Sequence, residues 1–436
     1  MAYRDFDSIS RRALLRGGAM LGAGAGLLAW PATSVLARQT AQWSHVAEFV
    51  NGYVTSRRVA NMVATLGWGQ QPATTIARGM LALGGRTEAG PDSLYRIYSM
   101  TKPVTGMAAM MLIDEGKLGL DQPLGEVLPA FREMQVQRTY DGLLTDVVPA
   151  ERPITIRHLL THTAGFGYSI VQRGPISRAY QDAGLIPGQV TKLPLAELFG
   201  RGQPVRGLDR FADALANLPL VAQPGTRWSY SVSLDLLGRV IEVASGQEFA
   251  EFLEDRFFEP LGMRSTYFRV PERDLHRLTT NYGVVAGTLV PVDPPELSVY
   301  ADEPAFPFGG AGLVSSPADY DRFLQMLASG GVFEGRRIMG AEAVRVGTSN
   351  LLPEGVSTAG TFADGSGFGA GGRVGLGAQA GTFGWGGAAG TIGFVNVANG
   401  LRASLMTQYM PAEAYPVQTG FPAAVLKDLA AMPAAA

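Results

Sequence analysis

The sequence contains no cysteine and only four histidines among its 436 residues. Without cysteine the chain can form no disulfide, no thiol nucleophile and no cysteine-ligated metal site. Charge is sparse as well, since 17% of the residues are Asp, Glu, Lys or Arg and the formal net charge is −2. That balance lacks the basic footprint of a nucleic-acid-binding protein, so we expect no nucleic acid partner.

Several common catalytic and nucleotide-binding patterns are also missing. No Gly-x-Ser-x-Gly stretch occurs, which argues against the nucleophile elbow of an α/β-hydrolase. There is neither a P-loop nor a dinucleotide-binding glycine fingerprint. His158 and His162 are four residues apart, but no Glu lies between them, so we interpret them as packed or hydrogen-bonded side chains. We expect no metal and no organic cofactor.

Lysine is the scarcest of the common charged residues. The four lysines are Lys102, Lys117, Lys192 and Lys427, and all other basic residues except histidine are arginines. Arginine stays protonated in proteins, whereas a buried lysine can lose its proton. Lys102 follows Ser99 by three residues, which on a helix places the amine one turn away on the same face. That spacing is what a serine nucleophile needs from an amine that is to take its proton.

The residues around Ser99 predict a junction between a strand and a helix. Residues 94–98 read as a short strand, and Pro103 suits an early helical position. Apolar residues then recur with helical spacing, and Gly116 marks the end of the helix. Ser99 therefore lies where free backbone N–H groups and the helix dipole favour a developing negative charge.

The first 37 residues are predicted to be a targeting segment. Ser10-Arg11-Arg12 resembles a twin-arginine motif, and an apolar run follows from Gly17 to Trp30. Val35-Leu36-Ala37 then supplies a small-residue cleavage site. The alternative is a retained membrane anchor, but the apolar run is short of a full bilayer span. We expect cleavage after Ala37, export in the folded state to the periplasm or medium, and no stable membrane insertion afterwards.

The remainder of the chain predicts a sheet domain with an insertion. Hairpins are expected around Asp141-Gly142 and Asn399-Gly400, helices at 155–160, 234–246 and 423–432, and a loop or lid over 168–210. We assign residues 38–125 and 295–436 to an α/β (α+β) domain, with an antiparallel sheet built from both termini and flanked by helices. Residues 126–294 form the inserted, mainly helical domain.

Four motifs together resemble one known superfamily. Ser99-Met100-Thr101-Lys102-Pro103 looks like the first motif of the serine β-lactamases and penicillin-binding proteins. The segments 159–165 and 224–231 are similar to two motifs of the class C-like branch, and the second of them points to Tyr230 as a catalytic tyrosine. Trp385-Gly386-Gly387 occupies the place of the Lys-Thr-Gly motif. The resemblance spans roughly residues 45 to 410 and implies a β-lactamase/transpeptidase-like fold.

Two departures from the class C pattern narrow the resemblance. The second motif reads Tyr230-Ser231-Val232 instead of Tyr-x-Asn, and Trp385 replaces the basic residue of the third. Both variants are similar to those of the family VIII carboxylesterases. Val232 cannot hydrogen-bond a side-chain amide, and Trp385 cannot attract the carboxylate of a penicillin. An apolar ring there favours a neutral acyl or alcohol group.

The resemblance implies a serine carboxylesterase that acts through an acyl-enzyme at Ser99. Lys102 and Tyr230 would share one proton and act together as base and then as acid, so neither is assigned as the single base. The backbone N–H groups of Ser99 and Ala388 would form the oxyanion hole. Trp385, Gly386 and Gly387 would line the substrate pocket.

Three alternatives remain at the level of sequence. A β-lactamase or DD-peptidase would need a carboxylate anchor that the third motif lacks. An acyltransferase would use the same acyl-enzyme with an alcohol in place of water. A protein that only binds ligands would be expected to have lost Ser99, Lys102 or Tyr230, and all three are present. The expected partner is a small-molecule ester, with weak or no hydrolysis of β-lactams.

Overall fold

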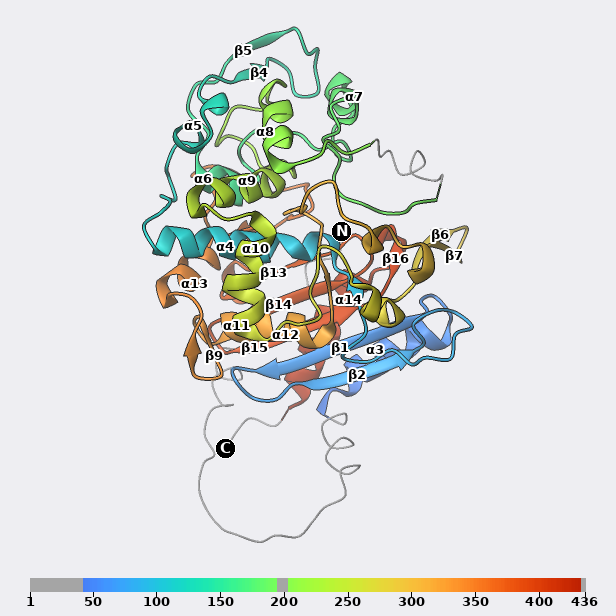
Figure 1. Cartoon of the computed structure of the whole chain (residues 1–436). Coiled ribbons are helices and arrows are strands. Elements are labelled where there is room, and N and C mark those ends of the chain that lie inside the picture. Colours follow the sequence, from blue (N-terminus) through green and yellow to red (C-terminus); the bar gives the residue numbers. More distant parts are fainter. Residues whose placement is uncertain (1–41, 194–202, 433–436) are drawn as a thin grey trace, which may run out of the picture.

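A seven-stranded antiparallel sheet forms the base of the molecule in the computed structural model, which describes residues 42–193 and 203–432 (Figure 1). The strand order is β11-β12-β13-β14-β15-β1-β2. Two strands come from the first part of the described chain and five from the last, which confirms that both ends build the sheet. Their bounds are β1 Asn61–Trp68, β2 Thr74–Gly79, β11 Gly367–Phe368, β12 Arg373–Val374, β13 Thr382–Gly386, β14 Ile392–Asn396 and β15 Leu401–Met406. The predicted targeting segment, residues 1–37, lies outside the described residues.

Helices cover both faces of this sheet. Because successive strand residues point to opposite faces, Met62, Ala64 and Leu66 pack on one side and Val63 on the other. The first side is covered by α3 (Ser44–Thr55) and α14 (Val417–Ala431), which also contact each other. The second side is covered by α4 (Thr101–Asp114) and α12 (Pro317–Ala328). The core therefore lies in two layers, one on each face of the sheet.

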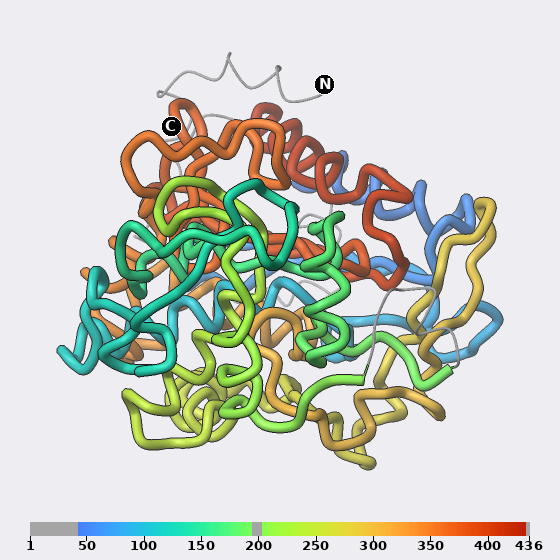
Figure 2. The backbone as a smooth tube through the Cα atoms, turned by 90° about the horizontal axis from the view of Figure 1, so that it is seen from above, coloured from blue at the N-terminus to red at the C-terminus, as the bar shows by residue number. Residues whose placement is uncertain are grey.

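The helices between residues 124 and 245 gather on the side of α4 away from the sheet, and the later helices, between residues 249 and 347, lie beside α4 or on its sheet side (Figure 1). Figure 2, viewed from above, shows the teal-to-green part of the chain lying across the molecule and nearest the viewer. The helices are α5 Leu124–Val127, α6 Ile156–Leu160, α7 Pro175–Asp182, α8 Leu208–Ala216, α9 Ser233–Ser245, α10 Phe249–Leu253, α11 Glu259–Leu261 and α13 Ala341–Gly347. α4 contacts α9, α13 and β13 and is buried along most of its length. Helix α4 therefore lies between the sheet and helices such as α9, and it contacts both. The domain boundaries expected from the sequence stay a prediction.

Short strand pairs complete the fold. β3 (Tyr95–Arg96) pairs with β8 (Val314–Ser315), and β4 (Gln135–Gln137) pairs with β5 (Val147–Pro149). The others are β6 Asn281–Val285, β7 Thr288–Asp293 and β16 Tyr409–Met410 in one three-stranded sheet, and β9 Val332–Phe333 with β10 Arg336–Arg337. In the described residues no helix combines the length and hydropathy that crossing a bilayer requires.

Most local predictions are confirmed, and three need correction. The loop expected over 168–210 contains α7 and the start of α8, because Ile176 and Tyr180 bury one helical face there. The hairpin around Asp141-Gly142 exists, but its strands are β4 and β5 and its connection runs from 138 to 146. The last helix begins at Val417 and not at 423, with Pro422 inside it.

Candidate active site

Ser99 lies in a single 3₁₀ turn, Tyr98–Met100, between β3 and α4, so the predicted strand-to-helix junction is confirmed. The backbone of Tyr98 has φ +43°, a left-handed value that non-glycine residues adopt at a free-energy cost. The Tyr98 side chain is held in place, because its hydroxyl accepts a hydrogen bond from Asn281 Nδ2 at 3.2 Å and its ring meets Tyr300 edge-on. The strained turn leaves Ser99 only partly covered at the head of α4.

Lys102 lies one turn along α4 and is completely buried. Its Nζ donates to Ser99 Oγ at 3.3 Å and to the carbonyl oxygen of Gly310 at 2.6 Å. The same nitrogen lies 4.6 Å from the centre of the Tyr230 ring and 5.7 Å from that of Tyr168. The structure thus brings the predicted nucleophile, the amine and the tyrosine together.

Tyr230 precedes α9, and its hydroxyl meets Trp385 on β13. Trp385 Nε1 donates to the Tyr230 hydroxyl at 3.0 Å. Both side chains are at least nine-tenths buried. The motif alone predicts only an apolar ring at Trp385. The structure adds a polar role, because this hydrogen bond fixes the position of the Tyr230 hydroxyl.

Aromatic side chains enclose Tyr230 on several sides. The rings of His162, Tyr168, Trp228, Phe362 and Trp385 all have their centres within 6.0 Å of that of Tyr230. Phe362 is 54% exposed, so this enclosure is open to solvent at one edge. The apolar surroundings strengthen electrostatic interactions inside the site.

The glycines of the third motif allow a close approach of β13 to the turn that carries Ser99. A Cβ on Gly387 would lie 2.3 Å from the carbonyl oxygen of Ile97, and one on Gly386 would lie 2.6 Å from Gln418 Nε2. Gln418 Nε2 in turn donates to the Gly387 carbonyl at 2.8 Å. Ala388, the next residue, packs in one apolar cluster with Tyr98. The oxyanion-hole role of the Ser99 and Ala388 N–H groups stays a prediction, and this packing agrees with it.

Two further ionisable groups lie near Lys102, and of these the sequence predicts only His162, as a packed or hydrogen-bonded side chain. Asp235, in the first turn of α9, is completely buried, and its Oδ1 accepts the N–H of Gly310 at 2.8 Å. Burial raises its pKa to about 6, while the Lys102 charge and the Gly310 N–H act in the opposite direction. His162 is also buried, and burial together with the Lys102 charge lowers its pKa well below the ordinary value. His162 is therefore a neutral imidazole at pH 7.

His158 and His162 are both buried and hydrogen-bonded, which confirms the interpretation from the sequence. His162 Nδ1 lies 3.0 Å from Ser231 Oγ, which explains a polar residue after Tyr230. His158 closes a capping box at the start of α6, where its Nδ1 accepts the Thr155 N–H at 3.2 Å and Thr155 Oγ1 accepts the His158 N–H. Within 42–193 and 203–432, no group of three His, Asp or Glu side chains is arranged to bind a metal ion.

Arg373 supplies a cation beside the third motif. Its Cζ lies 5.4 Å from the centre of the Trp385 ring, and its Nη2 donates to the carbonyl oxygen of Phe362. The motif itself offers no cation, because its opening residue is Trp385. β12 precedes β13 in the chain and pairs with it, which places Arg373 next to the motif in space.

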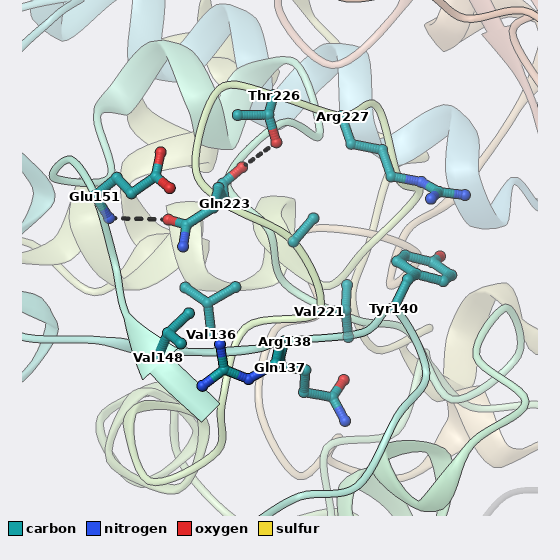
Figure 3. Close-up of a pocket in the computed structure, with 11 residues that line it drawn as sticks. Val136, Gln137, Arg138, Tyr140, Val148, Glu151, Val221, Gln223, Thr226 and Arg227 are labelled. Carbon is teal, nitrogen blue, oxygen red and sulfur yellow. Dashed lines mark hydrogen bonds between the residues drawn. The ribbon is translucent and has the colours of Figure 1, made fainter. Parts of the chain in front are cut away.

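A separate pocket of about 340 Å³ lies between the β4–β5 hairpin and the segment 221–227 (Figure 3). At one side the Arg227 guanidinium stacks 3.8 Å from the centre of the Tyr140 ring. The Tyr140 hydroxyl lies 3.1 Å from Ser229 Oγ and accepts from Gln172 Nε2 at 2.6 Å. This pocket contains none of the predicted catalytic residues, and its contacts fix the segment that leads to Tyr230.

Comparison with known proteins agrees with this arrangement. A family model described as "Beta-lactamase" matches residues 46–425. Protein Rv1367c of Mycobacterium tuberculosis is 38% identical over 266 residues, which cover 60% of this chain and 61% of that protein. Esterase EstB of Burkholderia gladioli is 32% identical over 249 residues, covering 54% and 57% of the two chains. The chain thus spans less than two thirds of the length of these curated relatives.

A solved structure shows the same fold over almost its whole length. It is described as "EstCE1, a hydrolase with promiscuous acyltransferase activity". The TM-score is 0.71 with 24% sequence identity, and the match covers 90% of this chain and 99% of the other. At that identity the likeness concerns the fold, and the chemistry must be argued from the residues.

Proposed function

The chain belongs to the beta-lactamase family, and within that family we propose that it is a serine ester hydrolase that forms an acyl-enzyme at Ser99. The contact that carries the proposal joins the buried Lys102 Nζ to Ser99 Oγ at 3.3 Å, beside Tyr230. A nucleophile and an amine within hydrogen-bond reach, with a third group on the amine, form the arrangement expected of an activated serine.

The proposed reaction has two halves. Ser99 Oγ attacks the ester carbonyl carbon, and its proton passes to the Lys102–Tyr230 pair. The tetrahedral oxyanion is stabilised by the backbone N–H groups of Ser99 and Ala388. The bond to the alcohol oxygen breaks, and the alcohol leaves with that proton. Water then attacks the acyl group, gives up a proton to the same pair, and releases the acid as Ser99 regains its hydrogen.

We further propose that short, neutral esters are the preferred substrates, as in the family VIII carboxylesterases. The Trp385 ring replaces a cation at the third motif, so a substrate carboxylate there loses a charge-assisted hydrogen bond. That loss is about 1.5–3 kcal/mol, or roughly 10- to 150-fold in rate or affinity. Arg373, 5.4 Å from the Trp385 ring centre, favours some residual turnover of β-lactams as the second activity.

The test compares kcat/KM for p-nitrophenyl butyrate and for a chromogenic cephalosporin. We expect the wild type to prefer the ester and Trp385→Lys to shift the ratio toward the cephalosporin. Trp385→Phe is the matched control, because it removes the hydrogen bond to Tyr230 but adds no charge. Higher wild-type efficiency on the cephalosporin would replace the esterase proposal with a β-lactamase one. Running the ester reaction with an added alcohol measures the share of acyl transfer.

For location, we propose export to the periplasm through the twin-arginine route. The proposal rests on Ser10-Arg11-Arg12 and on the small residues that end at Ala37. We expect the exported protein to begin after Ala37 and Arg11→Lys/Arg12→Lys to stay in the cytoplasm. N-terminal sequencing of fractionated cells tests both. Export of the double-lysine variant at the normal level would exclude this route.

A further inference from the structure

Asp235 is a buried carboxylate next to the proposed catalytic amine that no step so far uses. It is 0% exposed, and so is Lys102. Its Oδ1 accepts the Gly310 N–H at 2.8 Å, while the Gly310 carbonyl accepts from Lys102 Nζ at 2.6 Å. Asp235 Oδ2 is buried and has no hydrogen-bond partner among the described residues. Burying a carboxylate oxygen without a hydrogen bond costs free energy of folding. We therefore expect this carboxylate to have a function that explains its burial.

The backbone of Gly309 and Gly310 packs tightly between α4, which carries Lys102, and α9, which carries Asp235. A Cβ on Gly310 would lie 2.7 Å from Asp235 Oδ2, and one on Gly309 would lie 2.4 Å from the Leu234 carbonyl. From the other side, Thr105 Oγ1 of α4 donates to the Gly309 carbonyl at 2.7 Å. A side chain at either glycine would collide with these neighbours, and the backbone of Gly310 thereby links the Asp235 carboxylate to the Lys102 amine.

We propose that Asp235 is a positioning residue that completes a Ser99–Lys102–Asp235 arrangement: it holds the Gly310 backbone against Lys102 and stabilises the ammonium that forms when Lys102 takes the proton of Ser99. In this step the Ser99 O–H bond breaks, a new N–H bond forms at Nζ, and Asp235 gains no proton. The inference rests on the proposed function, since it assumes that Ser99 is the nucleophile and that, within the Lys102–Tyr230 pair, the proton of Ser99 arrives at Lys102. It extends that function by naming the group that compensates the positive charge.

The other ionisable groups that face Lys102 cannot supply this charge. His162 is neutral because burial and Lys102 lower its pKa. Tyr168 and Tyr230 present their rings to Nζ, which stabilises a cation more weakly than a carboxylate does. Asp235 is therefore the one carboxylate among the described residues that the contacts around Gly310 connect to Lys102. At pH 7 it carries its charge, because its pKa is about 6.

The kinetic test replaces Asp235 with asparagine, which keeps an oxygen for the Gly310 N–H and removes the charge. A nearby opposite charge shifts a pKa by about 1–3 units, so we expect kcat to fall roughly 10- to 1,000-fold. KM should stay within about twofold, and the acid limb of the pH–rate profile should move to lower pH. Asp235→Glu should restore part of kcat.

Asp319→Asn is the matched control. Asp319 is also the third residue of a helix, is also buried, and also accepts a backbone N–H, from Ser265 at 2.6 Å. A general effect of removing a buried charge would alter both variants alike. We expect Asp319→Asn to keep the wild-type kcat and pH profile. Wild-type kinetics in Asp235→Asn, or the same change in Asp319→Asn, would overturn the proposal.

A second measurement does not depend on any activity. With only four lysines, ¹³Cε-lysine labelling gives a spectrum in which Lys102 is assigned by replacing each of the others with arginine. We expect the titration of Lys102 to move to lower pH in Asp235→Asn and not in Asp319→Asn. If Asp235→Asn does not fold, the wild-type Lys102 signal must still show an inflection near pH 6, from Asp235. An absent inflection or an unmoved titration contradicts the role of Asp235. Absence of ester hydrolysis by the wild type, with the lysine shifts present, contradicts only the proposed function.

Discussion

At Lys102 the protein buries an amine completely while keeping it in contact with Ser99. The Gly310 carbonyl accepts from Nζ at 2.6 Å and the centre of the Tyr230 ring lies 4.6 Å away, so these groups hold the amine beside Ser99. A lysine amine in this place can accept a proton, whereas an arginine could not, because its guanidinium stays protonated.

Replacing Lys102 with arginine therefore tests proton transfer apart from charge. We expect Lys102→Arg to lose roughly 10²- to 10⁴-fold in kcat/KM, close to the loss in Lys102→Ala. Lys117→Arg is the control, since Lys117 is a surface side chain paired with Glu115, and it should keep wild-type activity. Substantial turnover by Lys102→Arg would make Lys102 an electrostatic residue and place the base elsewhere.

The sequence predicts the residues of the site that belong to local motifs, namely Ser99, Lys102, Tyr230 and Trp385. It does not predict Asp235, because an acidic residue in the first turn of a helix is already explained by the helix dipole. Nor does it predict Arg373, which meets Trp385 only through the pairing of β12 with β13. Contacts across the sheet have no signature in one sequence.

Among the elements, those with a capping or turn signal were predicted well. α9 ends at Gly246, whose φ is +75°, and the β14–β15 hairpin turns at Gly400 with φ +77°. The sequence does not predict α7, because this helix is short and rich in polar residues and its two buried side chains do not stand out. The sequence predicts the start of α14 too late, because a proline such as Pro422 is typical of the first helical position.

α6 offers a test of stability at the level of one element. Its capping box needs a neutral His158, whose pKa burial lowers to about 4. The unfolded chain therefore binds more protons between pH 4 and 6.5, and the stability present above pH 6.5 is lost as the pH falls through that window. Glutamine caps in the same way without titrating.

We expect His158→Gln to match the wild type at pH 7 and to exceed its unfolding free energy by about 2 kcal/mol at pH 5. Urea denaturation at the two pH values measures the difference. His276→Gln, at an exposed position, is the control and should leave the pH dependence unchanged. An equal gain at both pH values would mean that packing, and not protonation, explains the effect.

At the scale of the whole molecule, Arg96 forms hydrogen bonds with three segments that lie far from it in the sequence. It is 0% exposed and donates from Nε to Asp293 Oδ2 at 2.6 Å and from Nη1 to the Thr279 carbonyl at 2.6 Å. Its own N–H donates to Gln408 Oε1 at 3.1 Å. Because Arg96 lies three residues before Ser99, this cluster fixes the strand that leads to the nucleophile.

Removing the Arg96 side chain leaves the negative charge of the buried Asp293 without its partner, which destabilises the folded state by about 3–5 kcal/mol. We expect Arg96→Met to lower the unfolding free energy by that amount in guanidinium denaturation. Adding Asp293→Asn should recover part of the loss, since the unpaired charge causes most of it. A double variant less stable than Arg96→Met would show instead that Asp293 contributes through its other hydrogen bonds, to Ser298 and Val299.

The central claim, a covalent reaction at Ser99, is tested most directly by labelling the protein with a fluorophosphonate probe and mapping the adduct by mass spectrometry. We expect the probe on Ser99 and on no other serine. Ser99→Ala should take up no probe and hydrolyse no ester while it keeps its fold, because a hydroxyl at a helix start contributes at most about 1–2 kcal/mol. An adduct on a different residue, or ester hydrolysis by a folded Ser99→Ala protein, would contradict the account.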